Sequence, residues 1–240
     1  MKLKLLTYNL FYGGALPDAR KLIEKEQPDI VCVQELPTTH KHLSYLSMPP
    51  YKLATWTNSF IKYWEIFGIA IYLNKKTCSL IESHDDLLPG SAYDWWIHLK
   101  HGMSIKRSFI EAKILFKPLQ KEIYVYNTHL THVSFAELRL AQIQTVFKYM
   151  DTQVLNNEPV IITGDLNLYN GKTELEKLMS QYNLQEATSN LAYTFQHPFL
   201  LWTWKTKLDY VMSRNLDISS TRRLDRGCSD HHPIITEFEL

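Results

Sequence analysis

The sequence has few cysteines, few glycines and no long apolar run, and each shortage narrows the kind of protein it encodes. Its 240 residues include 3 cysteines without a paired spacing and 8 glycines, so neither a disulfide framework nor a fibre is indicated. No stretch of about 18 apolar residues is present, and residues 1–6 alternate as a strand does instead of forming a signal peptide. We therefore expect a reducing, cytoplasmic compartment and no stable membrane insertion.

Net charge is almost absent as well. The chain carries 26 Lys and Arg against 25 Asp and Glu, a formal net charge of +1. Such a chain has no long-range field to hold a polyanion, so an anionic substrate must be bound by a local patch or by metal ions. Hydrophobic residues make up 45% of the sequence, which is enough for a sizeable core, and we expect one domain over residues 1–240.

Two segments of the chain have the pattern strand, helix, strand and then an acidic residue. In the first, alternation from Leu3 predicts a strand that ends near Asn9, helical spacing follows residue 17, and the apolar run 30–34 leads to Glu35. In the second, a strand over 123–128 precedes an amphipathic helix over 134–154 and a buried strand over 160–163 that leads to Asp165. Further strands are predicted at 67–73, 109–116, 208–212 and 234–238, with a short helix at 173–182. The pattern favours mixed α/β sheets with helices outside.

Polar residues follow these apolar strands, at the ends where sites of α/β folds gather: Asn9, Glu35, His129, Asp165, Asn167, Asp209, Asp230 and His231. Each position alone also fits a structural role, such as a turn residue or a cap. Taken together, the set is rich in carboxylate and amide oxygens, which suit a hard cation better than zinc. We therefore expect Mg²⁺, with Mn²⁺ as a substitute.

Six short segments together resemble a known family, the endonuclease/exonuclease/phosphatase superfamily with the fold of pancreatic DNase and exonuclease III. They occur in the family's order and span nearly the whole chain: Thr7-Tyr8-Asn9, Val33-Gln34-Glu35, Asn127-Thr128-His129-Leu130, Ile162-Thr163-Gly164-Asp165-Leu166-Asn167, Leu208-Asp209-Tyr210-Val211 and Ser229-Asp230-His231-His232-Pro233-Ile234. Singly, Gly-Asp-x-Asn and Ser-Asp-His are only moderately specific, but all six in order form a strong signal.

The resemblance implies a four-layer α/β/β/α sandwich and a metal-assisted phosphoester hydrolase. Carried over by position, Glu35 resembles the principal Mg²⁺ ligand, with Asn9 and Asp230 completing or supporting the metal shell. The resemblance also implies roles for the remaining residues: Asp165 and Asn167 orient the attacking water, His231 pairs with Asp209, and His129 donates to a phosphoryl oxygen. A phosphodiester anion repels hydroxide, so such a site must supply positive charge and donors where negative charge develops.

The substrate is left open by these motifs, because selectivity resides in the variable loops, here expected at 56–65, 84–107 and 193–207. These loops interleave aromatic with basic residues, a composition that suits stacking on single-stranded nucleic acid: Trp56, Phe60, Tyr63, Trp64, Tyr93, Trp95, Trp96, Phe195, Phe199, Trp202 and Trp204 with Lys62, Lys100, Lys106, Arg107, Lys205 and Lys207. The apolar tip at 198–204 also allows peripheral contact with a membrane.

We expect a monomeric, Mg²⁺-dependent phosphodiesterase of nuclease type. The alternative is a phosphatase or phosphodiesterase of lipid or small-molecule phosphoesters, of the phosphoinositide or sphingomyelin type. A catalytically inactive binding module is disfavoured, because no position of the six segments is degraded.

Overall fold

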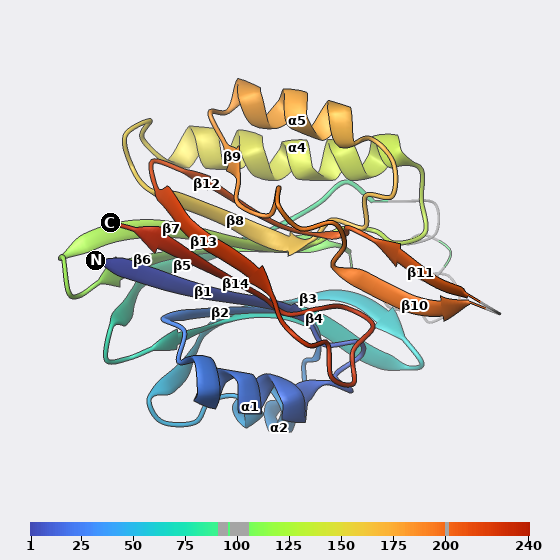
Figure 1. Cartoon of the computed structure of the whole chain (residues 1–240), viewed down its shortest axis with the longest axis horizontal. Coiled ribbons are helices and arrows are strands. Elements are labelled where there is room, and N and C mark those ends of the chain that lie inside the picture. Colours follow the sequence, from blue (N-terminus) through green and yellow to red (C-terminus); the bar gives the residue numbers. More distant parts are fainter. Residues whose placement is uncertain (91–95, 97–105, 200–201) are drawn as a thin grey trace.

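The computed structural model describes residues 1–90, 96, 106–199 and 202–240, and it shows two packed β-sheets with helices on both outer faces (Figure 1). In the first sheet the strand order is β13-β14-β1-β2-β4-β3. The second sheet has the order β5-β6-β7-β8-β12-β9. The expected four-layer α/β/β/α sandwich is therefore confirmed.

The bounds of the elements are as follows. The first sheet and its helices comprise β1 (Lys2–Asn9), α1 (Leu16–Glu26), β2 (Ile30–Pro37), α2 (His40–Tyr45), β3 (Tyr51–Lys62), β4 (Glu65–Asn74), β13 (Asp217–Arg223) and β14 (Ile234–Glu239). The second comprises β5 (Cys78–Leu87), β6 (Ser108–Phe116), β7 (Lys121–His129), α4 (Ala136–Gln153), β8 (Val160–Asp165), α5 (Lys172–Gln181), β9 (Gln185–Glu186) and β12 (Asp209–Arg214). A separate hairpin of β10 (Phe195–Phe199) and β11 (Trp202–Thr206) projects from one end of the molecule (Figure 1).

Three apolar clusters hold the layers together. The central cluster lies between the sheets and takes residues such as Leu5 and Ile71 from the first sheet and Ile114 and Val125 from the second. One outer cluster packs the first sheet on α1 and α2, and the other packs the second sheet on α4 and α5. Because successive side chains of a strand point to opposite faces, a strand buried on both faces reads as an unbroken apolar run, as β2 does at residues 30–33.

The two strand–helix–strand segments take equivalent places in the two sheets. β1 pairs in parallel with β2, and β7 pairs in parallel with β8, with His129 opposite Asp165 in register. Parallel strands joined by a helix bring their carboxyl ends to the same edge of a sheet. Both predicted segments are thus confirmed, and each delivers its acidic residue to one end of the sandwich.

Several elements were not predicted, and some expected loops are strands. Residues 56–62 belong to β3, residues 84–87 to β5, and most of 193–207 to the β10–β11 hairpin, while residues 91–95, 97–105 and 200–201 lie outside the described part. β3 and β5 are edge strands with many polar or exposed residues, so they lack the apolar pattern that identifies a strand.

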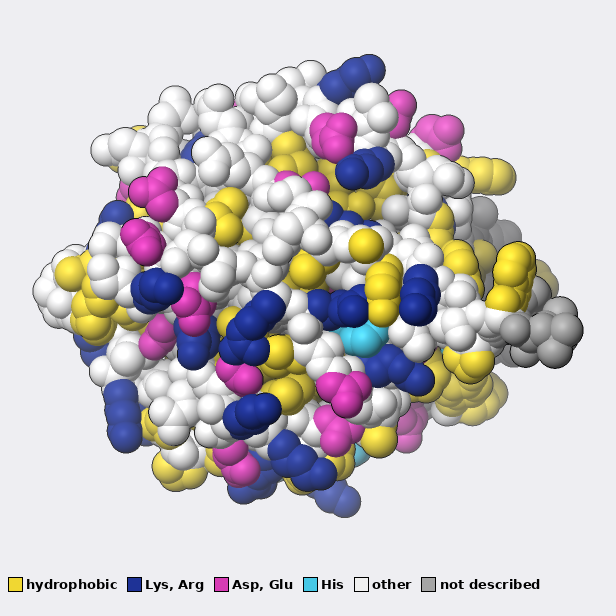
Figure 2. Space-filling model, viewed as in Figure 1, with side chains coloured by type: hydrophobic (Ala, Val, Ile, Leu, Met, Phe, Trp, Pro, Cys, Tyr) yellow, Lys and Arg dark blue, Asp and Glu magenta, His cyan; other side chains and the backbone are white. Residues whose placement is uncertain are grey.

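The molecular surface agrees with the balanced composition. Figure 2 shows basic and acidic side chains interspersed over one face of the molecule. In the part of the chain that the structure describes, no helix is long and apolar enough to cross a membrane.

Candidate active site

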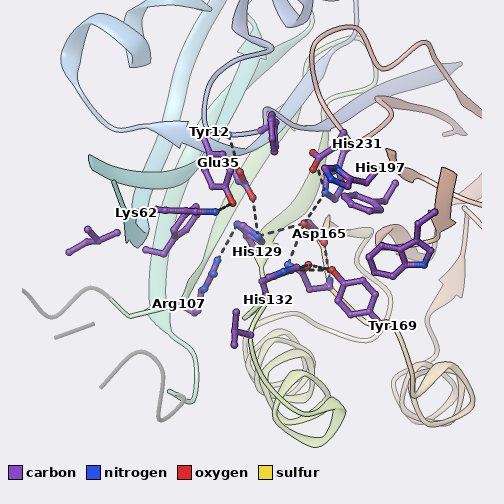
Figure 3. Close-up of a pocket in the computed structure, with 18 residues that line it drawn as sticks. Tyr12, Glu35, Lys62, Arg107, His129, His132, Asp165, Tyr169, His197 and His231 are labelled. Atoms are coloured by element: carbon purple, nitrogen blue, oxygen red, sulfur yellow. Dashed lines mark hydrogen bonds and ion pairs between the residues drawn. The ribbon is translucent and has the colours of Figure 1, made fainter. Parts of the chain in front are cut away.

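A pocket of about 330 Å³ opens at the end of the sandwich where β1, β2, β7 and β8 finish (Figure 3). Six of the sequence-predicted residues line it: Glu35, His129, Asp165, Asn167, Asp230 and His231. The other two, Asn9 and Asp209, are buried behind the lining and hydrogen bond to it. The structure therefore brings all eight residues together.

Glu35 is turned into the pocket by a break in its strand. The pairing of β2 with β4 shifts register between Val33 and Leu36, and Glu35 has a left-handed φ of 55°. This bulge redirects the side chain from the path that strict alternation would give. The Tyr12 backbone N–H donates to Glu35 Oε2 at 2.9 Å, which fixes the carboxylate.

Asn9 links two carboxylates. Its Nδ2 donates to Glu35 Oε1 at 3.3 Å and to Asp165 Oδ2 at 2.9 Å, and its Oδ1 accepts from the Phe11 N–H at 3.0 Å. In this arrangement the amide holds the carboxylates in place, and the amide oxygen faces the backbone. A direct ligand role for Asn9 stays a prediction.

Asp165 is held by hydrogen bonds from Asn167, two positions further along the chain. The Asn167 backbone N–H donates to Asp165 Oδ1 at 2.9 Å, and Asn167 Nδ2 lies 3.1 Å from the Leu130 carbonyl oxygen and 3.4 Å from Asp165 Oδ2. The preceding Gly164 has a φ of 147°, and a Cβ there would lie 1.9 Å from the Thr128 carbonyl oxygen. Only glycine allows β8 to approach β7 this closely just before Asp165.

His129 is a neutral donor. Arg107 Nη1 lies 3.2 Å from His129 Nδ1, and because a guanidinium only donates, Nδ1 must accept and Nε2 must carry the proton. Burial, together with the positive charge of Arg107, lowers the pKa of His129 well below its usual value. Its Nε2 lies 3.8 Å from Glu35 Oε1 and 3.6 Å from Asp165 Oδ2, so the N–H points between the two carboxylates.

His231 has the opposite electrostatic character. Its Nδ1 lies 2.8 Å from Asp209 Oδ2, and its Nε2 lies 3.6 Å from Asp165 Oδ2. Burial disfavours the charged ring, but Asp209 and the neighbouring Asp165 and Asp230 together outweigh burial and raise the pKa of His231 to about 10. At neutral pH the ring is therefore an imidazolium whose Nε2–H points into the pocket.

Three carboxylates share this small buried volume. Burial raises the pKa of Glu35 and of Asp230, and it raises the pKa of Asp165 to about 7 although His231 opposes the shift. Buried carboxylates that raise one another's pKa attract a cation, which restores their charged form.

The arrangement of oxygen atoms in the pocket fits a divalent ion. Glu35 and Asp165 each present a carboxylate oxygen, and these two atoms lie within 4.8 Å of one another. Asp230 Oδ1 is buried and has no hydrogen-bond partner among the described residues. An acceptor without a donor, in the pocket that Glu35 and Asp165 also line, fits a hard cation that prefers oxygen ligands.

Other residues of the site were not assigned a role from sequence. Arg107 fixes the tautomer of His129, and Tyr169 and His132 form a polar group with Asn167, with His132 Nδ1 3.1 Å from both Asn167 Oδ1 and the Tyr169 hydroxyl. Arg107 had appeared only among the basic residues of a variable loop, and no spacing signal links it to His129, which lies 22 positions away.

Comparison with known proteins places this geometry in a family. The model of the "Endonuclease/Exonuclease/phosphatase family" matches residues 6–231. The curated Escherichia coli protein YbhP, described as uncharacterized, is 25% identical over 99% of this chain and 96% of its own length.

Two solved structures show the same fold at low identity. Danio rerio TDP2, complexed with a single-strand DNA product, has a TM-score of 0.74 at 15% identity over 100% of this chain and 99% of its own. The mannosyl-6-phosphatase Bt3783 of Bacteroides thetaiotaomicron has a TM-score of 0.76 at 16% identity over 99% of this chain and 100% of its own. Together with the family match over nearly the whole sequence, these findings establish that the chain belongs to the endonuclease/exonuclease/phosphatase family.

Proposed function

We propose that this phosphoester hydrolase is a Mg²⁺-dependent phosphodiesterase of nuclease type. The observation that carries the proposal is the convergence of two imidazoles on one carboxylate. His129 Nε2 and His231 Nε2 each lie 3.6 Å from Asp165 Oδ2, outside hydrogen-bond distance, so both N–H groups remain directed at whatever enters the pocket. A phosphoryl group offers two non-bridging oxygens to such a pair.

Glu35 and Asp230 would hold the Mg²⁺ ion, with Asn9 steadying Glu35. When bound, the ion neutralises negative charge on the phosphoryl group and polarises it, and Mn²⁺ fills the same role. Every other part of the reaction belongs to side chains of the protein.

Asp165 orients the attacking water, and Asn167 fixes Asp165 by two hydrogen bonds. The water oxygen forms the new bond to phosphorus as the bond to the leaving oxygen breaks, the Asp165 carboxylate accepts the proton of the water, and the leaving oxygen takes a proton from solvent. Charge that develops on the non-bridging oxygens is met by the neutral donor His129 and the cationic donor His231. Asp209 holds His231 in the required orientation.

The proposal is tested with bis(4-nitrophenyl) phosphate as diester and 4-nitrophenyl phosphate as monoester. Purified protein is assayed with Mg²⁺, with Mn²⁺ and after removal of metal with EDTA. We expect diester hydrolysis that EDTA abolishes and either ion restores. Hydrolysis of the monoester alone, or diester hydrolysis unaffected by EDTA, contradicts the proposal.

A matched pair of variants assigns the activity to the site. Asp165→Asn keeps the shape of the side chain but removes its charge, and we expect kcat to fall about 10²-fold to 10⁴-fold. Asp151→Asn, at a half-exposed carboxylate that pairs with the buried Arg214 and does not line the pocket, serves as the control and should leave kcat unchanged. Equal rates for the two variants would remove Asp165 from the mechanism.

A further inference from the structure

The pocket has two unlike walls on either side of the row formed by Glu35, His129 and Asp165 (Figure 3). Lys62 and Arg107 lie on one side of this row, while His231, His197 and Tyr169 lie on the other side. A symmetric diester would need no such difference. If the proposed function holds, the side chains of the two walls therefore indicate which class of phosphodiester the pocket binds.

The first wall is cationic. Lys62 is half-buried at the end of β3, where its ammonium donates to the Tyr12 hydroxyl and lies 4.0 Å from the centre of the Tyr12 ring. Among the described residues no carboxylate lies within ion-pair distance of Lys62. The Arg107 guanidinium lies 4.5 Å from the centre of the Phe60 ring, and Phe60 belongs to β3, as Lys62 does. The Lys62 ammonium, which an aromatic ring holds in place of an acid among the described residues, keeps its charge available to an anion.

The second wall is aromatic and is built on the β10–β11 hairpin. Register places His197 opposite Trp204, and the Phe195 ring contacts both Trp204 at 5.6 Å and His231 at 5.0 Å. Tyr169 stacks on Trp204 with centroids 5.3 Å apart and planes at 17°.

The Trp204 indole is therefore supported but not covered. Tyr169 occupies one face, and Trp204 as a whole residue stays 47% exposed. The Tyr169 hydroxyl is in turn fixed by His132 Nδ1 at 3.1 Å, and the Arg139 guanidinium lies 5.4 Å over the Tyr169 ring. A rigid, half-open indole beside the catalytic His231 provides a stacking surface for a planar group.

We infer that the substrate is a single-stranded nucleotide chain whose second phosphate binds at Lys62 and whose nucleobase stacks on Trp204. The cationic wall would bind a further phosphate beside the one that is cleaved. The aromatic wall accounts for a flat ring on the opposite side. Sphingomyelin fits poorly, since its choline cation would be repelled by the first wall, and a phosphoinositide offers further phosphates but no base.

The experiment uses the thymidine dinucleotides TpT, pTpT and TpTp with Mg²⁺. Both pTpT and TpTp carry one added terminal phosphate. We expect one of them to have a KM roughly tenfold below that of TpT, because a charge-assisted contact with Lys62 contributes about that much. Lys62→Met should remove this advantage, so that the three dinucleotides have similar KM values. Lys52→Met, an exposed lysine of the same strand, is the matched control and should behave as wild type.

Two further variants separate binding from support of the fold. Tyr12→Phe removes the hydroxyl that Lys62 contacts and should retain the pTpT or TpTp advantage, whereas loss of that advantage would show that Lys62 acts only through Tyr12. Trp204→Ala should raise KM for every dinucleotide, and Trp204→Phe should restore most of it. Trp56→Ala, another half-exposed indole, is the control.

A binding measurement tests the inferred substrate independently of turnover. Fluorescence anisotropy with labelled oligothymidylate in EDTA should give a logarithmic salt slope that falls by about 0.7 in Lys62→Met, the value for one lost contact on a single strand. Vesicles of phosphatidylcholine with 5% phosphatidylinositol 4,5-bisphosphate should not compete with the oligonucleotide. Equal KM values for all three dinucleotides, or tighter binding to the vesicles, would overturn the inference. Failure to cleave any diester while binding keeps this pattern would refute the proposed function alone.

Discussion

A buried pair of amides joins the two sheets directly below the active site, and its removal is expected to be costly. Asn127 of β7 accepts a hydrogen bond from Gln34 Nε2 at 2.7 Å and donates to the carbonyl oxygens of Val33 at 3.0 Å and Ala70 at 3.1 Å. Val33 and Ala70 pair at the edge of the bulge that turns Glu35 into the pocket, where the regular ladder is interrupted. Asn127 thus supplies donors from the opposite sheet.

The substitution Asn127→Ala removes both donors and leaves two buried carbonyl oxygens without them. Each such group costs about 1–3 kcal/mol, so the free energy of unfolding should fall by about 2–6 kcal/mol. Urea unfolding followed by circular dichroism at constant m-value measures the difference. Asn156→Ala, at an exposed position, is the control and should stay within about 0.5 kcal/mol of wild type. A loss below about 1 kcal/mol in Asn127→Ala would refute this explanation of the bulge.

Three other outcomes follow from the structure. Gly164→Ala should lower the free energy of unfolding by more than about 2 kcal/mol, because the new Cβ meets the Thr128 carbonyl oxygen at 1.9 Å, and a loss below that in urea unfolding would contradict the close approach. Burial raises the pKa of Glu111, whose carboxylate accepts a hydrogen bond from the Tyr126 hydroxyl. Ionisation of Glu111 therefore lowers the free energy of unfolding once pH exceeds the pKa that Glu111 has in the unfolded chain. In denaturant titrations the free energy of unfolding of Glu111→Gln should therefore equal that of wild type near pH 4 and exceed it by pH 8. A difference that shrinks as pH rises would contradict the raised pKa. Cys228 is the exposed thiol, so a native-state thiol assay should label one cysteine and a denatured sample all three, and further labelling of the native protein would contradict the burial of the others.

The sequence predicted the layers and which polar side chains meet at the pocket, because both depend on local patterns. Apolar runs such as 30–33 and 160–162 lie in strands buried on both faces, and the polar residue at the end of each run reaches the site. The two acids Glu35 and Asp165 were placed correctly, since parallel strands joined by a helix finish at one edge.

Other features depend on contacts between distant segments and were not predictable. Glu35 points into the pocket through a bulge and a left-handed φ, whereas alternation along β2 gives no sign of either. The amide pair Gln34 and Asn127 spans 93 residues, and the Lys62 contact with Tyr12 spans 50. The β10–β11 hairpin was expected as a variable loop: Trp202 and Trp204 alternate with Thr203 and Lys205, but the run has only 5 residues and is mostly exposed, so no buried apolar face identifies it as a strand.

The central claim is that the pocket cleaves phosphodiesters through a charged His231 held by Asp209. It is tested most directly by comparing kcat of His231→Gln with that of His232→Gln on bis(4-nitrophenyl) phosphate at saturating Mg²⁺. His232 is the adjacent histidine, and its ring bonds to the Leu224 carbonyl oxygen instead of lining the pocket. We predict a loss of about 10²-fold to 10³-fold for His231→Gln and a rate near wild type for His232→Gln. Equal kcat values for His231→Gln and the wild-type protein would contradict the account.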